Sequence, residues 1–141
     1  MSTKEKQAEA YLKEAKLSVE AAKANLEKAQ ETQKSLWHNI VKSSYDAMEQ
    51  AISAVLAHNE MSIPRSHPGK VEKFVKKFGE SKITERIYKW LRKRSKTQYV
   101  DLKKDEIIVP HMFFDESDAE SALDDAEFVV QKVDNDLSEA K

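Results

Sequence analysis

Residues 35–58 read SLWHNIVKSSYDAMEQAISAVLAH, and this stretch decides the fold. Apolar or small side chains recur in it at intervals of three and four residues. The stripe consists of Trp37, Val41, Ser44, Met48, Ala51 and Val55, and it is flanked by Ile40, Tyr45, Ile52 and Leu56. Side chains with this spacing lie along one side of an α-helix, and the flanking residues make that side wide. We therefore predict that residues 35–58 form the central helix of a helical core.

The preceding residues, 3–29, carry a narrower stripe with the same spacing. It consists of Leu12, Ala15, Val19, Ala22, Leu26 and Ala29. Because alanine is small, this stripe lets a partner helix approach closely. Residues 30–35 contain neither Gly nor Pro, which leaves open one continuous helix of more than about 50 residues, an unusual length in a small domain. We predict a turn there instead, with Ser35 capping the second helix.

A short third helix is predicted over residues 67–78, after a loop at 59–66. Pro68 suits the first helical turn, where its missing N–H is not needed, and Ser66 or His67 can cap that turn. The apolar face of this helix consists of Val71, Phe74, Val75 and Phe78. Gly79 follows directly and is expected to end the helix.

A fourth helix is predicted over residues 83–100. Its apolar face consists of Ile83, Ile87, Trp90 and Leu91, and Arg94 continues the same face. A charged residue is unexpected on such a face, so Arg94 either extends its guanidinium to the edge of the bundle or binds an anion. Because Trp90 lies beside Leu91 and Ile87, we predict it in the core and not as a platform for stacking bases.

Residues 102–116, LKKDEIIVPHMFFDE, interrupt the helical pattern. The run 107–109 predicts a short extended piece that ends at Pro110. The triplet Met112–Phe114 is too apolar to be left in water, so we expect it to fold back onto the bundle or to meet a second chain. The last helix is predicted from Ser117, with Glu120 completing a capping box.

The composition supports an all-α fold. The chain has 141 residues but only 2 glycines and 3 prolines. These are too few for the turns of β-sandwiches and β-barrels, and no Gly-rich phosphate loop is present. The absence of cysteine excludes disulfides, thiolate zinc sites and a cysteine nucleophile. We predict a single all-α domain over residues 1–141, an up-down helical bundle of about five helices.

Signals for membranes and metals are absent from the sequence. No apolar run approaches the roughly 18 residues of a membrane span, and residues 1–10 lack the apolar core of a signal peptide. We expect a cytoplasmic protein with no membrane partner. The four histidines show neither HxxxH nor HExxH spacing, so we expect no metal and no cofactor.

Charge is distributed unevenly along the chain, although the net charge is only −1. Residues 65–104 hold 14 Lys and Arg against 4 Asp and Glu, whereas residues 105–141 hold 2 against 12. Two interpretations are open. The basic segment can pack beside the acidic last helix, whose Asp118, Asp124 and Asp125 are otherwise expected to be solvated, or its basic face can bind phosphate.

Four motifs follow one another in an order typical of one domain family. Residues 44–52, SYDAMEQAI, form an aromatic and Ala-rich second helix, and His67 and Pro68 open the third. Residues 94–101, RSKTQYVD, form an Arg segment with Tyr and Asp, and AEF at 126–128 lies in an acidic last helix. Over nearly its whole length the chain resembles the HEPN (higher eukaryotes and prokaryotes nucleotide-binding) domain, which implies a helical bundle of this kind.

The resemblance also implies a partial catalytic site. Ribonuclease members of the family carry an Arg followed four to six residues later by a His. Arg94 matches that Arg and Ser95 the polar residue after it, but positions 99–101 are Tyr, Val and Asp. RNA cleavage without metal needs a group that titrates near neutral pH, and a phenol such as that of Tyr99 is a poor base. The sequence therefore leaves open whether the protein is an enzyme, with Arg94, Ser95 and Tyr99 as the only catalytic candidates.

The resemblance also implies that the protein forms a homodimer. Arg94, Ser95 and Tyr99 are expected to line an anion-binding cleft at the dimer interface, with a nucleotide or RNA as ligand. Its basic surroundings consist of Lys89, Arg92, Lys93 and Lys96. A minimal nucleotidyltransferase, or a toxin–antitoxin-type system, is the implied partner. The alternatives are a helical interaction module that binds no nucleotide, and a non-standard metal-independent ribonuclease.

Each candidate also has a structural interpretation. Arg94 can pair with Asp118 or Asp125 of the last helix, and Tyr99 can be a core or edge tyrosine with one hydrogen bond. His38 and His58 are expected at the surface, and His67 is expected to cap its helix. His111 lies in the irregular segment and can approach Arg94 in space, although it does not reproduce the local motif.

Overall fold

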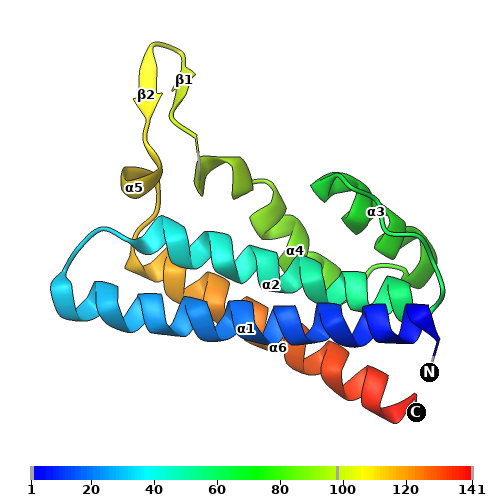
Figure 1. Ribbon diagram of the computed structural model, residues 1–141. Helices are drawn as coiled ribbons and strands as arrows, with labels where there is room; N and C mark the ends of the chain where they lie inside the picture. The colour runs from blue at the N-terminus through cyan, green and yellow to red at the C-terminus, as the bar shows by residue number, and fades with distance from the viewer. Residues whose placement is uncertain (1, 98, 141) are drawn as a thin grey trace.

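The computed structural model describes residues 2–97 and 99–140, and it confirms the predicted all-α bundle (Figure 1). The helices of ten or more residues are α1 (Thr3–Thr32), α2 (Trp37–His58), α3 (His67–Phe78), α4 (Lys82–Leu91) and α6 (Glu116–Glu139). Two of the five, α1 and α6, are longer than the central α2. In this described part of the chain, no helix is both long enough and apolar enough to cross a membrane.

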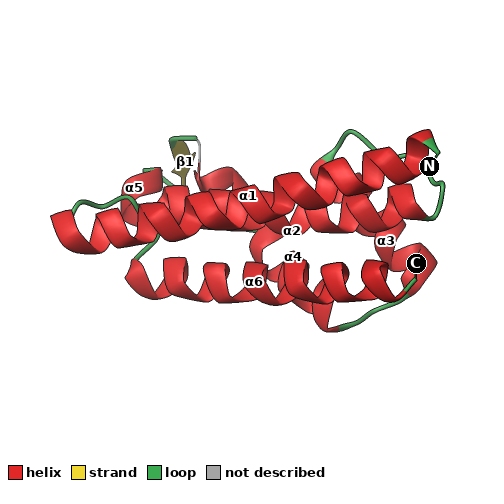
Figure 2. Ribbon diagram, turned by 60° about the horizontal axis from the view of Figure 1, so that its bottom comes forward, coloured by secondary structure: helices red, strands yellow, loops and turns green. Residues whose placement is uncertain are grey.

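The core is built around three long helices, α1, α2 and α6, each of which contacts the other two. α1 runs in the opposite direction to α2 and α6, and Figure 2 shows α1 and α6 side by side. Ala15, Ala22 and Ala29 on α1 are completely buried. The small side chains on this seam let α1 pack closely against its neighbours, as its sequence predicts.

α2 is the central helix, as the width of its apolar face predicts. It contacts α1 and α6 as well as α3 and α4, which lie on the other side of it in Figure 1. Its largest fully buried side chains are Ile40, Val41, Tyr45, Met48, Ile52 and Leu56. The apolar surface of α2 is thus buried within one chain, mostly by α1 and α6.

The helix ends confirm some predicted caps and correct others. A turn does separate α1 from α2, and Gln33 forms it with a positive φ of 56°. Ser35 does not cap α2, because its hydroxyl donates instead to the carbonyl oxygen of His111, 2.7 Å away. α6 begins at Glu116, and its capping box pairs Asp115 with Asp118 in place of Ser117 with Glu120. Asp115 and Asp118 have the same spacing as the predicted pair, so the pattern alone could not choose between them.

The prediction that the fourth helix reaches residue 100 is wrong. α4 ends at Leu91, the chain tightens as Lys93 N–H donates to the Trp90 carbonyl, and a 3₁₀ helix, η1 (Arg94–Thr97), follows. Residues 92–98 contain no large apolar side chain that could continue the buried face, so packing does not extend the helix. Thr97 is buried instead, and its hydroxyl donates to the carbonyl oxygen of Arg94.

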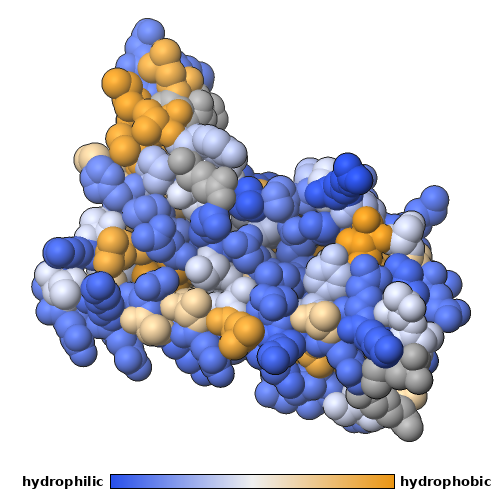
Figure 3. Space-filling model, viewed as in Figure 1, coloured by the Kyte–Doolittle hydropathy of each residue, from blue (hydrophilic) through white to orange (hydrophobic). Residues whose placement is uncertain are grey.

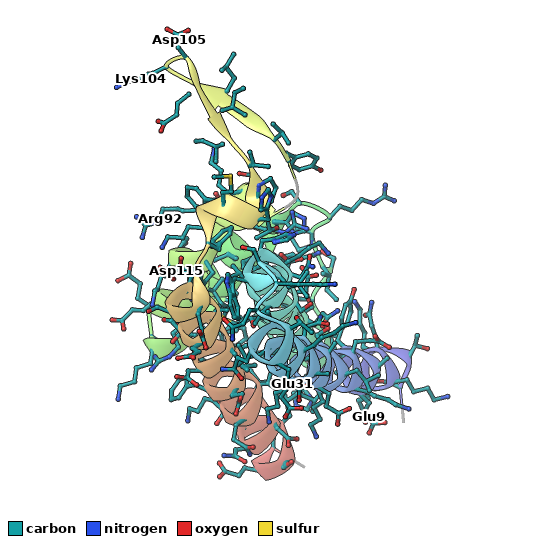
Figure 4. The ribbon with its side chains drawn as sticks, turned by 90° about the vertical axis from the view of Figure 1, so that its left-hand side faces the viewer. Glu9, Glu31, Arg92, Lys104, Asp105 and Asp115 are labelled. Atoms are coloured by element: carbon teal, nitrogen blue, oxygen red, sulfur yellow. The ribbon has the colours of Figure 1, made fainter. Side chains whose placement is uncertain are left out.

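Residues 101–113 form a small projection from the bundle. Strands β1 (Asp101–Lys103) and β2 (Glu106–Ile108) pair antiparallel, and the short helix α5 (Pro110–Phe113) follows. Lys104 and Asp105, labelled at its tip in Figure 4, both have positive φ, as a two-residue hairpin turn requires. The extended piece predicted at 107–109 is confirmed, because Ile107 and Ile108 lie in β2 and Val109 has an extended backbone before Pro110.

The projection carries several of the large exposed apolar side chains of the described residues. Leu102, Ile107 and Met112 are each more than two-thirds exposed. Figure 3 shows apolar surface on this projection, above a mostly hydrophilic face. The triplet 112–114 is divided: Phe114 is buried in the core, whereas Met112 is 75% exposed. Folding back onto the bundle is therefore confirmed for Phe114 only.

Candidate functional site

Arg94 lies at the start of η1, which packs against α2. Its guanidinium carbon is 5.9 Å from the centre of the Tyr45 ring, within the range of a cation–π contact. The side chain is half-buried, and its Nε is buried without a hydrogen-bond partner among the described residues. A buried N–H without an acceptor is costly in free energy.

The expected structural partners of Arg94 are engaged elsewhere. The Asp125 carboxylate accepts from the Trp90 indole at 2.8 Å and pairs with Arg86 at 3.3 Å and Lys89 at 3.5 Å. Asp118 accepts from the backbone of Asp115 in the cap of α6. The prediction that Asp125 is solvated is therefore wrong, since three donors from α4 surround it.

The other residues predicted to line the site are less buried. Ser95 is exposed, and its carbonyl oxygen accepts from the backbone N–H of Tyr99. The Tyr99 side chain is 62% exposed, so it is not a core tyrosine. The structure therefore places Arg94 and Ser95 in one 3₁₀ turn, whereas the Tyr99 side chain points mostly into solvent.

The basic side chains around Arg94 differ in their partners, and among them Lys89 pairs with the carboxylate of Asp125. Lys89, on α4, belongs to the Asp125 cluster and also donates to Ser121. Arg92, labelled in Figure 4, donates to the Tyr88 carbonyl, and Lys93 lies 5.1 Å from the ring of Trp90. Lys96 is half-buried. Trp90 itself is almost fully buried, which confirms its predicted place in the core.

A polar cluster that the sequence did not predict lies beside Tyr45. Glu49, one turn further along α2, is buried, and its carboxylate binds two side chains from the start of α3. His67 Nδ1 is 2.6 Å from one carboxylate oxygen, and Lys70 Nζ is 2.8 Å from the other. Ser66, and not His67, caps α3, so the predicted capping role of His67 is wrong.

The cluster fixes the charge of its members. Burial alone raises the pKa of Glu49, but the hydrogen bonds from Lys70 and His67 outweigh it and hold that pKa below its usual value. Burial, reinforced by the negative charge of Glu49, raises the pKa of Tyr45 far above its usual value. The Tyr45 hydroxyl lies close to Glu49 without forming a well-aligned hydrogen bond. Glu49 is thus an anion and Tyr45 a neutral phenol at physiological pH.

Tyr45 connects this cluster with Arg94. The His67 ring meets the Tyr45 ring edge-on, with 6.2 Å between the ring centres. Arg94 lies against the same ring, so two side chains from different elements flank one buried tyrosine. One signal in the sequence pointed to this cluster. Glu49 follows Tyr45 by four residues on a buried helix, where an unpaired carboxylate would be very costly.

A comparison with protein families agrees with this architecture. The family model described as HEPN domain matches residues 8–136. The chain belongs to the HEPN domain family. A search among curated proteins gives no match. Membership of the HEPN family indicates a function related to nucleotides or RNA in general.

His111 is the histidine for which the sequence of this HEPN domain allows an approach to Arg94. Its helix, α5, packs against η1 and α2, so the two segments do meet. The described contacts of His111, however, are with Ser35 and His38, and none is with Arg94. Burial, together with the nearby charge of His111, lowers the pKa of His38. His38 and His58, both predicted at the surface, are both half-buried. Within the described residues, no three His, Asp or Glu side chains gather as metal ligands.

Proposed function

We propose that this HEPN protein binds the phosphate groups of a nucleotide or RNA at Arg94. The observation that carries the proposal is the Arg94 guanidinium, half-buried against Tyr45 with an Nε that has no acceptor in the described structure. A guanidinium offers several N–H donors in a fixed plane that matches phosphate oxygens. A phosphate beside Arg94 would accept from these donors.

The neighbouring charges support the same assignment. The acidic α6 neutralises part of the basic segment, because Asp125 pairs with Arg86 and Lys89. This neutralisation stops at the end of α4. Arg92 and Lys93 contact a carbonyl oxygen and an aromatic ring, and the described residues give neither of them a carboxylate partner. An anion that approaches Arg94 therefore meets a positive potential.

We further propose that the protein is a cytoplasmic homodimer and the partner of a nucleotidyltransferase or of a toxin–antitoxin-type system. The apolar surface of α2 is buried within one chain, but the projection at 101–113 offers an exposed apolar surface to a second copy. Leu102, Ile107 and Met112 would lose their contact with water in such a dimer. The same surface also favours the second candidate function, a protein-interaction module without nucleotide binding.

A titration tests the phosphate-binding proposal. A fluorescent single-stranded RNA and adenosine 5′-monophosphate are titrated at low salt with the wild-type protein and with Arg94→Ala. Lys6→Ala, which removes one exposed cation near the N-terminal end of α1, is the control for net charge. We expect Arg94→Ala to weaken binding while Lys6→Ala does not, and added salt to weaken binding to the wild type. Equal affinity of the two variants would contradict the proposal.

A further inference from the structure

The orientation of His67 leaves one of its ring nitrogens available. Nδ1 lies against the Glu49 carboxylate, whose side chain is only 9% exposed, whereas the His67 side chain is 39% exposed. A carboxylate beside Nδ1 fixes the proton on that nitrogen and the direction of the ring. Nε2, across the ring, has no hydrogen-bond partner among the described residues.

Lys70 completes the support of His67. Its ammonium binds the second oxygen of Glu49, so the carboxylate cannot rotate without losing a contact. Glu49 comes from α2 and both donors come from α3. The imidazole is therefore held by two packed helices rather than by a loop, as in sites that keep a side chain in one orientation.

Arg94 and His67 belong to one neighbourhood although they are far apart in the sequence. Arg94 is 5.9 Å, and His67 6.2 Å, from the centre of the same Tyr45 ring. The guanidinium carbon of Arg94 and the centre of the His67 ring therefore lie at most about 12 Å apart. Figure 1 shows that η1 and α3 both lie on the side of α2 away from α1.

We infer that His67 is a second phosphate ligand, so that the anion site of this protein spans η1 and α3. Nε2–H donates to a phosphate oxygen while Arg94 binds the same phosphate or an adjacent one. Glu49 acts as the positioning residue, because it accepts from Nδ1–H and fixes the direction of the ring. The ligand is a phosphate ester, either a free nucleotide or RNA. This inference rests on the proposed phosphate binding at Arg94.

If the cluster has a purely structural role, a different result is expected for variants of His67. In that case His67 only ties α3 to α2 through Glu49, and Nε2 has no function. The substitution His67→Asn separates the two roles. The amide nitrogen of asparagine takes nearly the place of Nδ1 and can still donate to Glu49, but asparagine has no counterpart of Nε2.

The first experiment compares wild type with His67→Asn and Arg94→Ala. Adenosine 5′-monophosphate and single-stranded RNA are the probes, which separates a free nucleotide from a polymer, and adenosine is the control without phosphate. We expect His67→Asn to keep the melting temperature of the wild type and to bind the phosphate probes roughly tenfold more weakly, as the loss of one charge-assisted hydrogen bond does. Adenosine should not distinguish the variants.

The failures of the two proposals can be told apart. If Arg94→Ala weakens binding and His67→Asn binds as the wild type does, the inference about His67 is wrong and phosphate binding at Arg94 stands. If both variants bind as the wild type does, both proposals are wrong.

A second measurement does not depend on the folding of a variant. The imidazole ¹⁵N signals of His67 in the wild-type protein are followed while adenosine 5′-monophosphate is added. A shift of the Nε2 signal that adenosine does not cause supports the inference. An Nε2 signal that stays unchanged at saturation with adenosine 5′-monophosphate overturns it, because a nitrogen that donates to phosphate must change its environment.

Discussion

The guanidinium carbon of Arg94 lies 5.9 Å from the centre of the Tyr45 ring. The cation of the family's Arg segment thus contacts an aromatic ring, whereas the carboxylate of Asp125 is occupied by Arg86, Lys89 and Trp90. This arrangement decides how the protein should respond to the loss of Arg94.

Arg94→Ala should change the free energy of unfolding by less than about 1 kcal/mol. The substitution removes one cation–π contact at a half-buried site, and it leaves no carboxylate unpaired in the described structure. An arginine paired with a buried carboxylate would cost on the order of 3 kcal/mol when removed. Urea unfolding at pH 7 measures the difference, and a loss near the larger figure with unchanged RNA binding would show that Arg94 is structural.

Glu49→Gln should destabilise the protein by about 3 kcal/mol at pH 7. The substitution removes the charge that Lys70 and His67 share and leaves Lys70 facing a neutral amide at a buried site. Glu72→Gln, an exposed position on α3, is the matched control and should be neutral. Equal stability of the two variants in urea unfolding would show that the cluster contributes little.

Low pH should lower the stability of the wild-type protein through the protonation of Glu49. Because the folded protein holds the pKa of Glu49 below the ordinary 4.5, the unfolded chain takes up this proton first as the pH falls. The contribution of Glu49 is therefore complete above pH 4.5 and is lost as the pH falls below it. Melting temperatures measured between pH 3 and pH 7 should fall more steeply below that point for wild type than for Glu49→Gln. Parallel curves would contradict the prediction.

Local sequence patterns predicted the long helices well. The buried residues of α1 and α2 recur every three or four positions, and this spacing matches the 3.6-residue repeat of an α-helix. The same pattern failed after Leu91. Arg94 falls at the right interval to continue the α4 stripe, but a charged run offers no apolar area to bury, so tertiary packing ended the helix.

The polar clusters could not be predicted in the same way, because their members are distant in the sequence. His67 and Glu49 are 18 residues apart, and Trp90 and Asp125 are 35 residues apart. Each pair joins different helices, and only the packing of those helices decides which carboxylate meets which donor. The interpretation of His67 as a cap followed the local rule for helix starts, but Ser66 already fills that role.

Tyr45→Phe should leave stability at pH 7 unchanged or raise it by up to about 1 kcal/mol. The Tyr45 hydroxyl is buried and has no well-formed hydrogen bond, so phenylalanine removes a polar group that gains little from folding. Burial also raises the pKa of Tyr45 above the ordinary 10.0, so the unfolded phenol ionises first and the wild type loses stability as the pH rises above 10. Urea unfolding at pH 7 and pH 10.5 measures both effects. A clear loss of stability in Tyr45→Phe at pH 7 would show that the hydroxyl is bonded.

Light scattering should find a dimer at tens of micromolar, a range in which a dimer with the usual interface area persists. The apolar projection is the surface that we expect to be covered, because Ile107 and Met112 are otherwise left in water. Ile107→Lys should then give a monomer with an unchanged helical circular dichroism spectrum, since Ile107 lies outside the core. A wild-type monomer at this concentration would contradict the prediction.

Ribonuclease activity should be weak or absent. The Arg segment has no histidine four to six residues after Arg94, and the Tyr99 side chain that stands in this range is largely in solvent. Cleavage without metal needs a base that titrates near neutral pH and lies within hydrogen-bond distance of the 2′-hydroxyl. The assay incubates structured and single-stranded RNA with wild type and Arg94→Ala in the presence of a chelator. Robust cleavage that Arg94→Ala abolishes would contradict this prediction and would favour the non-standard ribonuclease. His67→Asn would then decide whether the imidazole held by Glu49 is the missing base, because it keeps the contact with Glu49 and removes only Nε2.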